Sequence, residues 1–459
     1  MPYIFKKYYP WRNLLFVIGE GALVFLVINS VLISWVGVSR FVEFFSFYIF
    51  RALIVTSVFQ LCFYYFDLYD LHVIPTIQEH MLKVLQTIGF ACILIAFIYY
   101  LAPFLVISTK IFWCLLFAAG VAVFFWRFLY FKILERRMFV QPIALIGTGK
   151  FAGEIVAAIE NKKDSGFKIV AFVGDPSSPI VKGGTPVFPE IKDLKGLCEQ
   201  QVVGKIVVAL DEKRGIPLYD LIPYKFLGIE ILGAARFFEE LTGKVPVARI
   251  SPSWLVFSEG FYVGRMMKTL KRTMDLLAAL SILLVSSPIL FASALIIKLE
   301  SPGEIFYRQE RVGENGKIFN IVKFRSMKTD AEKDGPKWAS LDDDRVTKFG
   351  RFIRKVRIDE LPQLFNVLKG DMSFVGPRPE RPVFVEELEK KIPFYNSRHI
   401  VKPGITGWAQ IYYPYGASVE DSLHKLEYDL YYIKNLSISI DLLTIFQTIK
   451  VVLFQKGSR

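Results

Sequence analysis

The N-terminal part of the chain contains four apolar runs, each long enough to cross a lipid bilayer as a helix. A transmembrane helix needs about 20 apolar residues, because the hydrocarbon core of a bilayer is about 30 Å thick. Glu20 and Arg51 interrupt two of these runs and are costly in lipid, so we expect them to face other helices or an interface. A transmembrane four-helix bundle is therefore predicted, with its helices at residues 14–36, 44–65, 81–107 and 111–134.

Basic residues gather at the outer ends of this predicted bundle: Lys6, Lys7 and Arg12 before the first run, and Lys132, Arg136 and Arg137 after the fourth. Cytoplasmic loops of membrane proteins carry such an excess, so both ends are expected in the cytoplasm. The net charge of +13 fits this bias and an attraction to anionic lipids or phosphorylated substrates. No basic helix or nucleic-acid motif accompanies it, so a nucleic-acid partner is not predicted.

A strand-helix-strand pattern follows the apolar runs. A buried strand beginning at Pro142 leads into the glycine pattern Gly147-x-Gly149-x-x-x-Gly153, and further strands are expected at 168–173 and 205–210. This alternation predicts a parallel sheet in a Rossmann-like α/β domain. Two interpretations of the glycines stay open: a nucleotide phosphate bound at the helix N-terminus, or a tight turn in a domain that has lost its cofactor.

Residues 275–297 form a fifth apolar run, which hydropathy alone would assign to another transmembrane helix. Basic residues flank both of its ends, and Ser287 and Pro288 lie in its middle, where proline removes a helix hydrogen bond. A full crossing would also place everything after it outside the cell. We therefore predict a re-entrant helix-break-helix over 268–298, with a serine hydroxyl meeting a carbonyl that Pro288 leaves free. An ordinary kinked span is the alternative.

Asp359 and Glu360 are adjacent carboxylates near a predicted helix start. Pro362 is tolerated only in a first helical turn and Gly370 is a typical C-terminal stop, so a helix is expected from about 360 to 369 with Asp359 near its N-cap. Its positive end is expected to keep Asp359 ionised. Without other charged residues nearby, Asp359 and Glu360 would be assigned only as the N-cap and first-turn charge of this helix. The basic residues around it instead favour phosphate chemistry: Lys323, Arg325, Arg351, Arg354, Arg357 and Arg378.

Several motifs together resemble the bacterial sugar transferases, which are monotopic polyprenyl-phosphate hexose-1-phosphate transferases. The resemblance covers roughly residue 268 to the C-terminus, and the upstream domains resemble long-form members that start exopolysaccharide or O-antigen units. The motifs are Lys271-Arg-x-x-Asp275, Tyr307-Arg-Gln-x-Arg-Val-Gly313, Lys323-Phe-Arg-Ser-Met327, Asp359-Glu-Leu-Pro-Gln363, Gly376-Pro-Arg-Pro379, Lys402-Pro-Gly-Ile-Thr-Gly-Trp-Ala-Gln410 and Tyr428-Asp-Leu-Tyr-Tyr-Ile-Lys-Asn435.

The resemblance implies a two-step reaction. Asp359 would attack a nucleoside-diphosphate sugar, expected to be a UDP-sugar, and pass the sugar phosphate to undecaprenyl phosphate. Glu360 would help to bind Mg²⁺, a role for which one carboxylate beside substrate phosphates suffices. Four residues fall on matching positions for phosphate binding: Lys323, Arg354, Arg378 and Asp429. Arg325 is assigned the same role because it is one of the basic residues expected around the carboxylates. Asp429 is equally open to a structural role as partner of an arginine.

The expected fold is thus a membrane protein with three domains: a transmembrane bundle at 1–137, a Rossmann-like domain at 138–250 and a mainly α catalytic domain at 251–459. The run at 436–454 is expected to lie along the membrane. The predicted location is the bacterial inner membrane, with the active site facing the cytoplasm. A homodimer is left open. A membrane-anchored nucleotide sensor or assembly scaffold is the alternative function.

Overall fold

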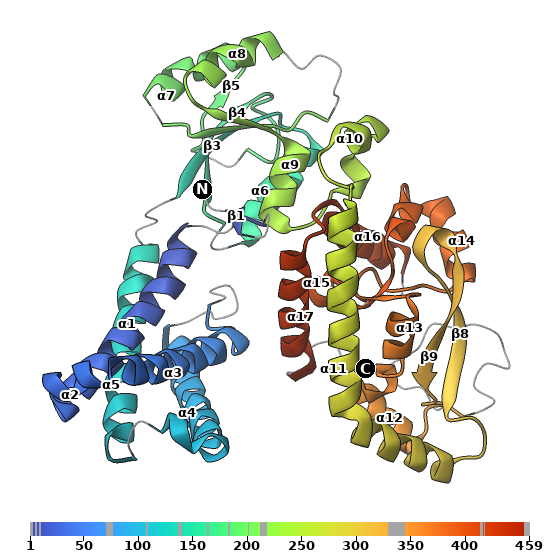
Figure 1. Ribbon diagram of the computed structural model, residues 1–459. Helices are drawn as coiled ribbons and strands as arrows, with labels where there is room; N and C mark the ends of the chain where they lie inside the picture. The colour runs from blue at the N-terminus through green and yellow to red at the C-terminus, as the bar shows by residue number, and fades with distance from the viewer. Residues whose placement is uncertain are drawn as a thin grey trace. The chain divides into compact units, whose positions relative to one another are not determined.

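The computed structural model describes residues 3–4, 7–8, 11–69, 77–106, 109–135, 140–162, 165–181, 184–200, 202–211, 218–328, 345–413, 416 and 418–453. The chain forms two compact units, Met1–Phe237 and Phe238–Arg459 (Figure 1). The three domains assigned from the sequence remain a prediction.

Four long helices make up most of the N-terminal part of the first unit: α1 (Trp11–Val36), α3 (Phe45–Tyr65), α4 (Ile77–Leu101) and α5 (Thr109–Glu135). Short elements accompany them: β1 (Tyr3–Ile4), β2 (Lys7–Tyr8), α2 (Val38–Glu43) and η1 (Pro103–Leu105). The four helices pack around a shared apolar core that includes Ile28, Phe59, Val84 and Val123. Together with α11 of the second unit, they are the described helices that are long and apolar enough to cross a membrane.

The third apolar run is shorter as a helix than expected. α4 ends at Leu101 rather than near residue 107. Pro103 disfavours helical dihedral angles at the residue before it, and Ala102 has φ −132°. The boundaries of the other three predicted runs agree with the observed helices to within a few residues.

Glu20 and Arg51 face other parts of the protein, as the sequence predicted. Glu20 forms a buried ion pair with Arg127 of α5, with Nε at 2.7 Å from Oε1 and Nη2 at 2.9 Å from Oε2. Arg127 also donates to the carbonyl of Leu68 and lies 3.0 Å from His80 Nε2. Arg51 donates to the carbonyls of Phe104 and Val106. Polar side chains thus tie together helices whose outer surfaces are apolar.

We expect Arg127→Leu to lower the free energy of unfolding by about 3–5 kcal/mol, because it leaves the Glu20 carboxylate buried without its partner. The double variant Glu20→Leu/Arg127→Leu removes both charges and should recover much of that loss. Thermal unfolding in detergent measures both effects. A single variant as stable as the wild type would contradict the role of this ion pair.

The rest of the first unit is a five-stranded parallel sheet in the order β5-β4-β3-β6-β7. Its strands are β3 (Gln141–Ile146), β4 (Phe167–Val173), β5 (Val187–Phe188), β6 (Lys205–Val208) and β7 (Glu230–Gly233). Its helices are α6 (Lys150–Asn161), η2 (Ile191–Leu194), α7 (Lys195–Glu199) and α8 (Leu218–Phe226), and α9 (Ala234–Thr242) leads into the second unit. The Rossmann-like prediction is confirmed, and β5 and β7 are additional strands.

The second unit combines helices with one β-hairpin and a short parallel strand pair. Its first elements are η3 (Val247–Arg249), α10 (Pro252–Phe257), α11 (Arg265–Glu300), β8 (Phe306–Val312), η4 (Glu314–Gly316), β9 (Ile318–Phe324), α12 (Lys348–Lys355), η5 (Ile358–Glu360) and α13 (Gln363–Lys369). There follow β10 (Ser373–Val375), α14 (Pro382–Lys391), η6 (Tyr395–Ile400), β11 (Gly404–Thr406), α15 (Trp408–Tyr412), α16 (Val419–Lys434) and α17 (Ile438–Leu453). Buried aromatic side chains such as Trp408 and Tyr431 stack in its core.

The predicted break at Ser287 and Pro288 is a bend within one helix. α11 is continuous over 36 residues, and its C-terminal part turns away from the axis of its first part (Figure 1). The Ser287 hydroxyl donates to the carbonyl of Leu284 at 2.8 Å, which is the acceptor that Pro288 leaves without an N–H donor. Ser286 donates in the same way to Ile282 at 2.6 Å. These bonds satisfy the carbonyls, so the helix bends without being interrupted.

Polar residues at the start of α11 fix it to the rest of the unit. Lys271 Nζ lies 2.7 Å from Asp441 Oδ2 of α17 and donates to the carbonyl of Val375. Arg272 donates to the last carbonyls of α13, and Asp275 accepts from the N–H of Phe374 at 2.9 Å. The motif Lys271-Arg-x-x-Asp275 thus positions α11 against α13, β10 and α17.

Candidate active site

Asp359 and Glu360 lie on the short 3-10 turn η5, ahead of α13. The expected helix start was wrong by three residues, because α13 begins at Gln363. Pro362 has no N–H to extend an α-helix, so this stretch uses tighter bonds such as Leu361 N–H to the carbonyl of Ile358. The predicted stop at Gly370 is confirmed by its φ of 97°.

Arg357, the residue before this turn, has left-handed backbone angles of φ 59° and ψ 22°. In a residue other than glycine, steric crowding makes this conformation unfavourable by roughly 1–3 kcal/mol. The left-handed residue turns the chain between α12 and η5. Strain of this kind is typical of positions where the fold holds functional side chains in place.

Glu360 is surrounded by cations. Its Oε1 lies 2.9 Å from Arg378 Nη2 and 3.3 Å from Lys323 Nζ, and its Oε2 lies 3.5 Å from Arg357 Nη1. Burial alone would raise the pKa of Glu360, but these three charges outweigh it and hold the pKa well below its ordinary value. Glu360 is therefore a permanent anion that collects basic side chains beside Asp359.

Asp359 is in a different environment. Its side chain is buried, with 9% exposure, and accepts no hydrogen bond from the residues that the structure describes. Burial, together with the charge of Glu360, raises the pKa of Asp359 to about 6, while Lys323, Arg354 and Arg378 oppose the rise. The expectation that a helix N-terminus keeps Asp359 ionised was wrong in its cause, since Asp359 caps no helix. Near neutral pH the carboxylate is nevertheless mostly ionised, without a hydrogen-bond donor from the described part of the chain.

Lys323 and Arg378 reach the carboxylates from separate parts of the fold. Lys323 lies near the end of β9, where burial lowers its pKa. Arg378 follows β10, in a segment whose backbone passes so close to its neighbour that a Cβ on Gly376 would lie 2.4 Å from the carbonyl oxygen of Lys402. Glycine is therefore required at position 376, and the prolines on either side of Arg378 restrict the backbone further.

Asp429 takes the structural role that the sequence left open. It is buried, and Oδ2 accepts from Arg398 Nη2 at 2.8 Å and Nε at 3.1 Å. Arg398 Nη2 also donates to the backbone carbonyl of Arg378 at 3.1 Å. Burial raises the pKa of Asp429 to about 6, against the effect of Arg398. Asp429 therefore acts through Arg398 to position the segment that carries Arg378. Arg398 lies in no motif, so sequence reasoning missed it.

Arg325 does not join the cluster around the carboxylates. Its buried guanidinium donates to the carbonyls of Ile297, Ser301 and Pro302 and to the hydroxyl of Ser301. These acceptors lie at the C-terminal end of α11, where carbonyls have no partner within the helix. The prediction that Arg325 binds phosphate is therefore not supported, because the helix end occupies its donors.

Arg354, in contrast, keeps its guanidinium available. It lies on α12, close enough for its charge to lower the pKa of Asp359. No hydrogen bond or ion pair of its side chain is found within the described ranges. Lys323, Arg354 and Arg378 therefore place positive charge around Asp359, and phosphate binding by these three residues stays a prediction.

The residues present fit Mg²⁺ only together with a substrate. Within the described residues no three His, Cys, Asp or Glu side chains form a metal-binding group. Mg²⁺ is, however, commonly held by one or two carboxylates and substrate phosphates, which Asp359 and Glu360 would allow. Both oxygens of Glu360 already face cations, so Lys323 or Arg378 would have to move to the substrate phosphates. When bound, the ion would neutralise phosphate charge.

The glycine turn of the Rossmann-like domain is filled by the protein itself. Asp211 Oδ2 and Oδ1 accept from the N–H groups of Lys150 and Phe151, at 2.8 and 3.0 Å, at the start of α6. A Cβ on Gly149 would lie 2.2 Å from Asp211 Oδ2, and one on Gly147 would lie 2.5 Å from the carbonyl oxygen of Ala209. The place where a nucleotide phosphate would bind holds a carboxylate. This arrangement favours the tight-turn interpretation of Gly147, Gly149 and Gly153.

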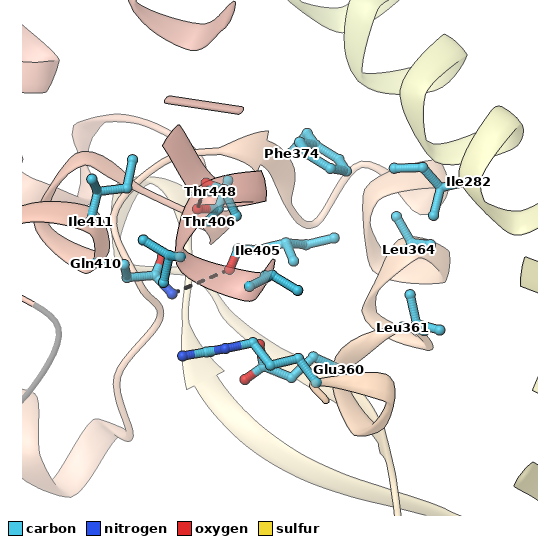
Figure 2. A pocket seen from close by; sticks show the side chains of 13 residues that line it. Ile282, Glu360, Leu361, Leu364, Phe374, Ile405, Thr406, Gln410, Ile411 and Thr448 are labelled. Carbon is cyan, nitrogen blue, oxygen red and sulfur yellow. Dashed lines mark hydrogen bonds and ion pairs between the residues drawn. The ribbon is translucent and has the colours of Figure 1, made fainter. Parts of the chain in front are cut away.

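A small cavity adjoins Glu360, one member of the carboxylate pair. Figure 2 shows Glu360 at its edge, with apolar side chains of Ile282, Leu361 and Leu364 along one side. Its volume is about 150 Å³. The remaining lining comes from other parts of the unit: Arg357, Phe374, Ile405, Thr406, Gln410, Ile411, Thr448, Val451 and Val452.

Known proteins resemble this chain over both units. Residues 266–455 match the bacterial sugar transferase family, and residues 64–218 match a CoA-binding domain family. The chain is 47% identical over 231 residues to the UDP-N-acetylgalactosamine-undecaprenyl-phosphate N-acetylgalactosaminephosphotransferase of Aeromonas hydrophila, covering 50% of this chain and 54% of that protein. It is 33% identical over 330 residues to the undecaprenyl-phosphate glucose phosphotransferase of Komagataeibacter xylinus, covering 70% and 61%.

A shorter relative is matched over nearly its whole length. It is an exopolysaccharide production protein of Rhizobium leguminosarum, 41% identical over 189 residues, which cover 39% of this chain and 93% of that protein. The chain spans only 54% and 61% of the two longer relatives.

Proposed function

The chain belongs to the bacterial sugar transferase family, and we propose that it transfers a sugar 1-phosphate from a UDP-sugar to undecaprenyl phosphate. The relatives from Aeromonas hydrophila and Komagataeibacter xylinus, whose names state reactions of this kind, support the proposal. The product would be the lipid-linked first sugar of an exopolysaccharide, capsule or O-antigen unit.

The observation that carries this proposal is the environment of Asp359. A buried carboxylate, with no hydrogen-bond partner among the residues that the structure describes, stands beside Lys323, Arg354 and Arg378. A merely structural carboxylate in such a place would be paired, because unpaired buried charge is costly. An attacking group has to be unpaired, and the surrounding cations match the charge of a diphosphate.

In the first step, an oxygen of Asp359 attacks the β-phosphorus of the UDP-sugar. The new O–P bond to Asp359 replaces the bridging P–O bond, and UMP leaves with that electron pair. In the second step, a phosphate oxygen of undecaprenyl phosphate attacks the same phosphorus and displaces the Asp359 carboxylate. Lys323, Arg354 and Arg378 neutralise the phosphoryl oxygens in both steps, which is the main demand of phosphoryl transfer.

Release of UMP tests the reaction. The purified protein, mixed with UDP-glucose or UDP-N-acetylgalactosamine but no lipid, should release at most one UMP per protein molecule and retain labelled sugar phosphate. Undecaprenyl phosphate should convert this single release into continued turnover. If every UDP-sugar tried gives UMP only when lipid is present, and no labelled protein forms, the covalent two-step reaction is wrong.

We also propose that α11 enters and leaves the membrane on the cytoplasmic side of the inner membrane. A straight helix of 36 residues would be about 54 Å long, well beyond the hydrocarbon core. Yet both ends of α11 contact the same unit: Lys271 near one end reaches Val375, and Arg325 binds the carbonyl of Ser301 just after the other. The bend that accompanies Pro288 allows this return.

A single cysteine tests this topology. In a variant without the native cysteines, Glu387→Cys on exposed α14 should react with a membrane-impermeant maleimide in inverted vesicles and not in intact spheroplasts. A cysteine at Lys195 of α7, exposed in the other unit, should give the same result. Opposite labelling of the two positions would mean that α11 crosses the membrane completely.

The alternative of a nucleotide-sensing scaffold receives less support. It would use the glycine turn of the Rossmann-like domain, where Asp211 binds the N–H groups that a nucleotide phosphate would need. The negative charge of the Asp211 carboxylate also repels a phosphate group.

A further inference from the structure

The lining of the cavity beside Glu360 is mostly apolar, and its uncharged polar residues are Gln410 and two threonines. Glu360 and Arg357 are its charged residues, and their ion pair at 3.5 Å defines the polar end of the cavity. Ile282 of α11 and Leu364 of α13 belong to the apolar walls (Figure 2). Val451 of α17 also lines the cavity. The hydroxyls of Thr406 and Thr448 bond to each other at 2.6 Å, so they satisfy one another and need no polar ligand.

The volume of about 150 Å³ limits what the cavity can hold. Pockets for drug-sized ligands measure about 300–1,000 Å³, so a whole sugar nucleotide does not fit. A dry apolar cavity of about 150 Å³ engineered in another protein binds benzene, a ring of six carbons. One branched five-carbon isoprene unit is of similar size.

The helices that wall the cavity also have exposed apolar surfaces. On α11, Leu284, Val285 and Phe291 are each at least 75% exposed, and on α17 Leu442 is 54% exposed. Lys271 bonds to Asp441 and thereby fixes α17 to α11. The cavity therefore lies between a highly apolar helix and an amphipathic one, within reach of a chain that enters from a membrane.

We propose that this cavity binds the isoprene unit next to the phosphate of the lipid acceptor, a proposal that rests on the function proposed above. The lipid phosphate then lies at the polar end, where Arg357 offers a cation and Asp359 is the neighbour of Glu360 in the chain. The rest of the isoprenoid chain runs out between α11 and α17. Because inorganic phosphate has no isoprene unit, contact with the first isoprene unit allows the protein to distinguish an isoprenyl phosphate from inorganic phosphate.

Val451→Phe tests this site by filling the cavity from α17. We expect the KM for undecaprenyl phosphate to rise at least about tenfold, since a single methylene in an apolar pocket is worth about 10–200-fold. The amount of UMP released from the UDP-sugar without lipid should be unchanged, because the donor does not use the cavity. Ile449→Phe, on an exposed part of the same helix, is the matched control and should change neither quantity.

Measuring the two steps of the reaction separately distinguishes a failure of the proposed function from a failure of the cavity assignment. If the wild type releases no UMP without lipid, the proposed function fails. If Val451→Phe releases UMP normally and keeps the wild-type KM for undecaprenyl phosphate, the cavity assignment is overturned. If Val451→Phe does not fold, Val451→Ala is used instead, and an unchanged KM in that variant likewise overturns the assignment. Farnesyl phosphate should compete with undecaprenyl phosphate in the wild type far better than inorganic phosphate does, and equal competition would refute isoprene recognition.

Discussion

Asp359→Asn is expected to abolish transfer of sugar phosphate to undecaprenyl phosphate, lowering kcat by about 10⁴-fold or more. The amide is a poor nucleophile, so neither the phosphorylated protein nor UMP should form. The decisive measurement is UMP release in the absence of lipid, which reports the first step alone. Mass spectrometry should find the sugar phosphate on the wild type and not on the variant.

Stability provides the control for this variant. Asp359 has a pKa of about 6 in the folded protein, above its ordinary value of about 4, so the folded state holds its proton more tightly than the unfolded chain. Ionising Asp359 therefore costs stability, increasingly as the pH rises through that range and fully above it. Asparagine removes this cost, and the Tm of Asp359→Asn at pH 7.5 should equal or exceed that of the wild type. An active variant would remove Asp359 from the reaction, whereas an inactive variant with a much lower Tm would leave loss of folding as the cause.

The features that the sequence predicted are those encoded by local patterns. Long apolar runs specified α1, α3, α4 and α5, because an uninterrupted run of about 20 apolar residues predicts a helix of that length. The alternation of strand and helix patterns, with a glycine turn after the first strand, specified the parallel sheet. Lys323, Arg354 and Arg378 were assigned by a combination of motifs, and their charges do converge on Asp359.

The features that the sequence did not predict depend on which donors and acceptors meet in three dimensions. Lys323 and Arg325 belong to the same short motif, yet one contacts Glu360 and the other the end of α11. Arg398 pairs with Asp429, and Arg127 pairs with Glu20. The partners in each pair are far apart in the chain, so the sequence did not indicate these buried ion pairs. Asp211 closes the glycine turn from about 60 residues away, where no local pattern indicates it. The cavity, likewise, is formed by elements that are distant in the sequence.

Glu360→Gln should slow the first step and also change its pH dependence. Glu360 holds Lys323, Arg357 and Arg378 by charge, and an amide holds them less firmly. Misplacement of such groups by 1 Å costs on the order of 100-fold in rate, so we expect a loss of about that size in UMP release. In the wild type, the rate should fall as the pH drops through about 6, because protonated Asp359 cannot attack.

The charge of Glu360 is one cause of the raised pKa of Asp359, so its removal should lower that pKa and move the acidic limb of the rate profile below pH 6. A stopped-flow measurement of UMP release between pH 4.5 and 8 compares the two proteins, with Glu387→Gln on the surface as the control that removes a remote carboxylate. An acidic limb that stays in place or moves upward would mean that another group controls it. A shifted limb with a slower plateau would show both effects of Glu360: its charge raises the pKa of Asp359, and its ion pairs hold the cations in place.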